Sequence, residues 1–99
     1  MMIRVARDLS VRLEAAEDLK RFKLVVEGDT AGETLQRALG EAGRLDGEHV
    51  WVSPAWLRRA SGRATDADWL RGFDAMVAFA AKQGWVDEAG AIRAHIERA

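Results

Sequence analysis

The chain has 99 residues, of which 48% are hydrophobic and 31% are charged, and it contains no cysteine. This composition is typical of one soluble domain with its own core, and the lack of cysteine excludes disulfides and thiolate chemistry. The net charge of −1 removes the simplest electrostatic argument for binding nucleic acid. No apolar run approaches about 20 residues, and the first residues lack signal-peptide features. We therefore expect a cytoplasmic protein without a membrane segment.

The first segment fits either a helix or a strand. Between residues 5 and 19, apolar side chains recur every three or four positions, as on one face of a helix. Between residues 9 and 13, however, apolar and polar residues alternate, as in a half-buried strand. Because the later part of this segment consists mostly of helix formers, we predict a helix from about Asp8 to Arg21. A short strand at Met2–Val5 is also compatible with the sequence.

The following segment predicts a strand, a turn and a helix. Residues 22–26 are rich in β-forming side chains and end at a Gly-Asp turn. Thr30 and Glu33 have the spacing of a capping box at the start of a helix. That helix should end near Gly43, and residues 44–47 should form a loop with an Asp-Gly turn.

The second half predicts the order strand, short helix, long helix, hairpin. His49–Val52 has the composition of a strand. Ser53 should cap a short helix over Pro54–Ala60, because proline is favoured in the first turn behind a capping side chain. A long helix should run from Thr65 to a glycine stop at Gly84. Alternating residues around an Ala-Gly turn predict a hairpin over Trp85–Glu97.

This order of elements resembles a winged-helix domain. The stretch from Phe73 to Val86 is similar to a docking helix that runs into the wing, although residues 49–97 match by element order and not by a specific motif. The resemblance implies a small α+β domain that meets nucleic acid or another protein. We expect one domain over residues 1–99, with a winged-helix-like C-terminal half and an N-terminal extension of helix and strand. The alternative is a two-layer sandwich in which residues 22–26, residues 49–52 and the hairpin share one sheet, with helices on one face.

Charges on the predicted docking helix bear on the kind of partner. A DNA reader presents basic and amide side chains to bases and phosphates. The predicted helix instead carries Asp66, Asp68 and Asp74, and acids facing phosphates weaken binding. A basic patch of Arg58, Arg59 and Arg63 at the short helix is typical of a solvated face. The charges therefore favour a protein partner over nucleic acid.

Four tryptophans without any tyrosine are a second unusual feature. Tryptophan fills cores and also anchors interfaces, and a domain of this size has difficulty burying four indoles completely. Trp69 shares a helix face with Phe73 and should be in the core, whereas Trp56 lies beside two arginines at a boundary. If the valines of the strand at residues 49–52 face the core, Trp51 should be the most exposed tryptophan.

The sequence contains no motif for catalysis, metal binding or cofactor binding. His49 and His95 are the only histidines, and neither has a metal-ligand spacing. His95 should face solvent, and Ser53 has the position of a helix cap, not of a nucleophile. We therefore expect no catalytic residue, no metal and no cofactor.

These observations predict a non-catalytic protein-interaction or regulatory domain whose partner is another protein or a second copy of itself, as in a homodimer. The candidate interface residues are aromatic, basic and acidic: Trp51, Trp56, Arg58, Arg59, Asp66, Asp68 and Asp74. One alternative is a DNA- or RNA-binding winged-helix protein. The other is a small-ligand binder or small enzyme with an apolar pocket lined by Trp51, Trp56 or Phe79.

Overall fold

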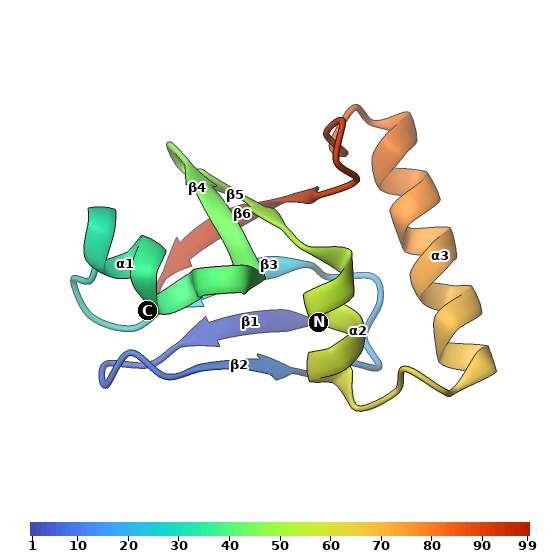
Figure 1. The fold of residues 1–99 in the computed structure, drawn as a ribbon, viewed down its shortest axis with the longest axis horizontal. Helices are drawn as coiled ribbons and strands as arrows, with labels where there is room; N and C mark the ends of the chain where they lie inside the picture. Colours follow the sequence, from blue (N-terminus) through green and yellow to red (C-terminus); the bar gives the residue numbers. More distant parts are fainter.

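One mixed six-stranded sheet organises residues 1–99, all of which the computed structural model describes (Figure 1). The strand order across the sheet is β2-β1-β3-β6-β5-β4. The central strands β1, β3 and β6 are parallel, and the remaining pairs are antiparallel. In chain order the elements are β1 (Met2–Val5), β2 (Val11–Glu14), β3 (Lys23–Val26), α1 (Gly32–Leu39), the short 3₁₀ helix η1 (Gly40–Ala42), β4 (Gly43–Asp46), β5 (His49–Val52), α2 (Pro54–Ser61), α3 (Ala67–Lys82) and β6 (Ile92–Arg98). The predicted α+β class is confirmed.

The two faces of the sheet differ sharply in polarity. Residues directly opposite each other in neighbouring strands share a face, so the register places Ile3, Leu24 and Ile96 in one apolar row. The other face carries a row that includes Lys23, His95 and His49. This alternation leaves one face to build the core and the other to meet water.

The helix α2 covers the apolar face and joins the two edges of the sheet. It contacts β2 at one edge and η1, which leads into β4, at the other. Its Leu57 is fully buried, and the backbone N–H of Ser53 donates to the Ala42 carbonyl at 2.9 Å. Figure 1 shows α2 beside the ends of β1 and β2, with α3 running along the outer side of α2. No helix combines the length and apolar character that crossing a bilayer requires.

The first half of α3 anchors this helix to the domain. Asp66 caps it by accepting from the backbone N–H groups of Asp68 and Trp69, both at 3.1 Å. The Trp69 ring stacks on Phe73 with centroids 5.0 Å apart, and its Nε1 donates to the Ala16 carbonyl at 2.8 Å. Trp69 therefore lies in the core, as predicted.

The helix predicted from Asp8 to Arg21 is wrong, whereas the strand at Met2–Val5 is confirmed. This segment contains β2, whose Val11 and Leu13 pack against the core. Leu9 and Ala15 flank β2 with φ values of 72° and 51°, which a helix does not allow. Pairing with β1 therefore decides the structure of β2 against the helix propensity of the segment.

Two further predictions between residues 30 and 47 are wrong. The N-cap of α1 is Ala31, with no side-chain cap, so the capping box does not form. The loop predicted after Gly43 is the strand β4. Gln36 ties β4 to α1, because its side-chain amide donates to the Gly43 carbonyl and accepts from the Leu45 N–H, both at 2.8 Å.

The second half follows the predicted order until its last element. The Ser53 hydroxyl accepts from the Trp56 N–H at 3.2 Å, which confirms the predicted cap of α2. The predicted hairpin is reduced to a single bridge between Val86 and Ile92. The last strand, β6, instead lies between β3 and β5. Residues 22–26 and residues 49–52 therefore share one sheet, as in the sandwich alternative, and the winged-helix likeness is not confirmed.

Candidate functional site

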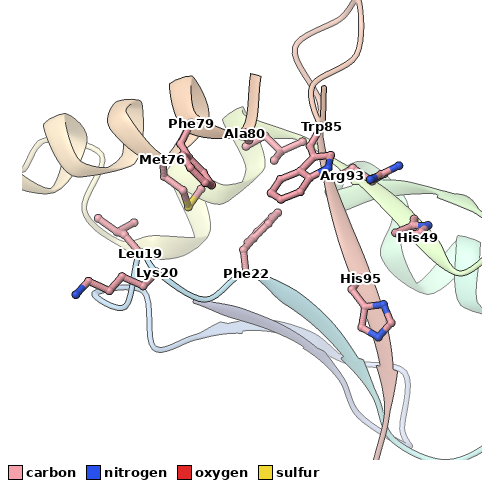
Figure 2. Close-up of a pocket in the computed structure, with 11 residues that line it drawn as sticks. Leu19, Lys20, Phe22, His49, Met76, Phe79, Ala80, Trp85, Arg93 and His95 are labelled. Atoms are coloured by element: carbon pink, nitrogen blue, oxygen red, sulfur yellow. The ribbon is translucent and has the colours of Figure 1, made fainter. Parts of the chain in front are cut away.

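A pocket of about 570 Å³ lies between the second half of α3, the loop before β3 and the start of β6 (Figure 2). This volume is within the range of roughly 300–1,000 Å³ that small-molecule sites occupy. Seven of its eleven lining residues are hydrophobic: Leu19, Phe22, Met76, Phe79, Ala80, Trp85 and Ile92. The other four are Lys20, His49, Arg93 and His95.

Helical spacing and the end of α3 build one wall of the pocket. Met76, Phe79 and Ala80 fall at positions i, i+3 and i+4, which share a face of a helix. Gly84, with a φ of +79°, then turns the chain back, and the Trp85 N–H donates to the Ala80 carbonyl at 2.9 Å. The Phe79 and Trp85 rings consequently meet edge to face, with centroids 6.2 Å apart.

The loop between β2 and β3 builds the facing wall with Leu19 and Phe22. Leu19 approaches α3 at Gly72, where an added Cβ would lie 2.6 Å from the Leu19 Cδ1 atom. Glycine at this position therefore lets the loop lie close against the helix. Both loop residues are half-buried and pack against the core, so this wall is held in place by the fold.

The polar side of the pocket comes from the outward face of the sheet. His49 on β5 lies directly opposite His95 on β6, with ring centroids 6.2 Å apart. His95 is exposed, as predicted, and Arg93 lies two residues before it on the same face. Figure 2 shows Phe22 and Trp85 between the α3 side chains and these three polar residues.

Arg93 is the exception among the basic residues of this face, because it has no acidic partner. Arg4 pairs with Glu14 at 2.9 Å and Arg44 pairs with Asp87 at 3.3 Å. Lys23 pairs with Glu97 at 2.6 Å, and its hydrogen bond lowers the pKa of the Glu97 carboxyl below the usual range. No acidic residue lines the pocket, and Lys20 also has no acidic partner. The pocket is therefore apolar with a basic rim.

The tryptophans predicted to contact a partner lie outside this pocket. Trp51 is half-buried on β5, where its Nε1 donates to the Asp46 carboxylate at 2.9 Å. Trp56 is half-buried on α2 and packs against the core. The prediction that Trp51 is the most exposed tryptophan is wrong, because Trp85 is 37% exposed, whereas the other three are half-buried or buried. Of the three residues predicted to line an apolar pocket, only Phe79 does so.

The charged residues predicted for the interface lie in ion pairs or caps on α2 and α3. Arg58 pairs with Asp74 at 3.8 Å, and its guanidinium lies 5.2 Å from the centre of the Phe73 ring. Arg59 pairs with Glu41 at 3.5 Å. Asp66 caps α3, and Asp68 pairs with Arg71 one turn later.

Phe79 is the only pocket residue that was predicted for such a site; the other lining residues, among them Leu19, Phe22 and Trp85, were not. The sequence signal for this site is Phe79, a large apolar residue that lies off the core-facing stripe of Trp69, Phe73 and Val77 on α3. No group of three or more histidine, aspartate or glutamate side chains is arranged to hold a metal ion. Comparison of the chain with protein-family models, curated proteins and solved structures gave no match.

Proposed function

We propose that the protein is a non-catalytic binding domain that takes a small, largely apolar molecule into the pocket beside α3. The observation that supports this proposal is the solvent exposure of two aromatic rings at the pocket. Phe79 is 57% exposed and Trp85 is 37% exposed, in a pocket of ligand-binding size. Clustered apolar surface of this kind marks binding sites, because its removal from water is favourable by roughly 25 cal/mol per Å².

A ligand in this pocket would lie between the wall formed by Met76, Phe79 and Trp85 and the facing loop wall of Leu19 and Phe22. Aromatic rings contact flat or edge-on groups favourably, and the thioether of methionine adapts to irregular shapes. The walls belong to a helix, a strand and a loop packed on the core. Binding would therefore order few additional side chains, which keeps its entropic cost low.

The test is a titration with N-phenyl-1-naphthylamine, a neutral probe that becomes fluorescent in apolar surroundings. Phe79→Ala should weaken binding about tenfold, the effect of losing roughly 1.4 kcal/mol of apolar contact. Leu9→Ala is the matched control, because Leu9 is 40% exposed and lies outside the pocket. Absence of probe binding, or equal binding by the Phe79 variant, would contradict the proposal.

A protein partner, or a second copy of this chain, is a second candidate that the exposed Phe79 and Trp85 favour. Aromatic side chains at a surface are common anchors of protein interfaces. In this case the domain would act as a regulatory or accessory unit, and wild-type protein would self-associate or bind its partner through these rings. Sedimentation equilibrium measures the molecular mass of the wild type and of Trp85→Ser in solution. A homodimer predicts that the wild type self-associates more strongly than the variant, and a strictly monomeric wild type would exclude the homodimer.

The winged-helix alternative, with DNA or RNA as the partner, has less support. Arg58 and Arg59 each have an acidic partner, which leaves less positive charge for phosphates. A mobility-shift assay with a labelled duplex at low salt tests whether the protein binds nucleic acid. A mobility shift that is lost when Arg58 and Arg59 are both changed to glutamate would favour nucleic acid.

A further inference from the structure

We infer that the ligand of this pocket is an amphipathic anion, with an apolar body against α3 and an acidic group, such as a carboxylate, at Arg93. This inference rests on the proposed function and names the class of ligand. It depends on the basic side chains around the pocket, which belong to different elements: His49 on β5, Arg93 and His95 on β6, and Lys20 in the loop before β3.

The unpaired guanidinium of Arg93 is the first reason. Neighbouring basic residues on the same face, Lys23 and Arg44, have acidic partners within 4.0 Å, whereas Arg93 has none. A guanidinium offers parallel N–H donors that match the two oxygens of a carboxylate. Arg93 thus presents an unused donor group at the edge of an apolar pocket.

Three acids near this pocket are the second reason, because their carboxylates already have partners. Glu97 pairs with Lys23 at 2.6 Å, and Asp46 accepts from the Trp51 Nε1 at 2.9 Å. Asp87 pairs with Arg44 at 3.3 Å and accepts from backbone N–H groups of its own turn. An anion entering the pocket therefore meets Arg93 and two imidazoles, with no carboxylate in the lining.

A second hollow in the molecule differs from the pocket beside α3 in the residues that line it. It has a volume of about 370 Å³ and is lined by Arg7, Gly28, Asp29, Arg98 and Ala99, with one hydrophobic residue among the five. This hollow has basic side chains but no apolar wall, and Asp29 opposes an anion. Of these two pockets, the one beside α3 combines an apolar wall with a rim free of acids.

The experiment compares two fluorescent probes that share one aromatic body. They are 8-anilino-1-naphthalenesulfonate, which is anionic, and the neutral N-phenyl-1-naphthylamine. Arg93→Gln should weaken binding of the anionic probe about tenfold, as expected for one charge-assisted hydrogen bond. Binding of the neutral probe should not change. Arg7→Gln, which removes an unpaired charge outside the pocket, should change neither. Decanoate should displace the anionic probe at lower concentration than decanol.

The outcomes separate the two proposals. If the neutral probe binds and Arg93→Gln weakens both probes equally or neither, the anionic class is wrong and the apolar site stands. Displacement by decanol at the same concentration as decanoate also overturns the anionic class. If neither probe binds, the proposed function fails and the ligand class fails with it.

Discussion

The aromatic residues in the two halves of α3 differ in burial. In the first half, Trp69 and Phe73 are 6% and 0% exposed and stack on each other within the core. In the second half, Phe79 meets Trp85 edge to face and both rings remain in contact with water. The same helix therefore uses Trp69 and Phe73 to hold the fold, whereas Phe79, together with Trp85 just after the helix, stays exposed at the pocket. Burial, more than residue type, separates the two roles.

The largest expected effect is the difference in stability between a substitution in the first half of α3 and one in the second half. Phe73→Ala should lower the free energy of unfolding by about 3–5 kcal/mol, because a fully buried ring leaves a cavity. Phe79→Ala should change it by less than about 0.5 kcal/mol, because an exposed ring adds little to the core. Urea unfolding of both variants measures the difference. Equal losses of stability would contradict the division of α3 into an anchoring half and a binding half.

A smaller effect is expected at Gly72, which lies between Trp69 and Phe73 in the first half of α3. In Gly72→Ala, the new Cβ would meet the Leu19 Cδ1 atom at 2.6 Å, so this side chain must shift at the pocket wall. The greater helix propensity of alanine, about 1 kcal/mol, offsets part of the clash. We expect nearly unchanged stability but altered affinity for N-phenyl-1-naphthylamine. Unaltered affinity would show that Leu19 does not shape the pocket.

The smallest effect concerns the paired charges beside the pocket. The Lys23 hydrogen bond lowers the pKa of Glu97 in the folded protein, so the pair stabilises the fold above the ordinary glutamate pKa. That stability is lost as the pH falls through the lowered pKa. Glu97→Gln should therefore slightly lower the melting temperature at pH 7 and reduce its decline toward pH 3. The same acid-dependent decline in the variant as in wild type would contradict this role for the pair.

Local signals in the sequence predicted the elements whose ends depend on local chemistry. Ser53 and Pro54 define the start of α2, and the alternation at residues 49–52 defines a strand with its valines in the core. The predictions were wrong where pairing with another strand decides the structure. The strand β2 depends on pairing with β1, and β6 depends on β3 and β5, none of which helix propensity or turn spacing describes.

The pocket was predicted only in part, for a related reason. Phe79 was recognised as a possible wall residue from the sequence. Its neighbours Leu19 and Phe22 belong to a loop more than 50 residues earlier, and they meet α3 only because the fold places that loop beside the helix. The free charge of Arg93 was equally hidden, since it depends on which acids the other basic residues engage.

The most direct test of the pocket is an NMR titration of the ¹⁵N-labelled protein with N-phenyl-1-naphthylamine. We expect the largest amide shift changes at residues 19–22 and 76–85, with small changes around Trp69 at the start of α3. Shift changes that centre on Trp51 and α2, or that are absent throughout, would contradict the claim that the second half of α3 forms the binding site.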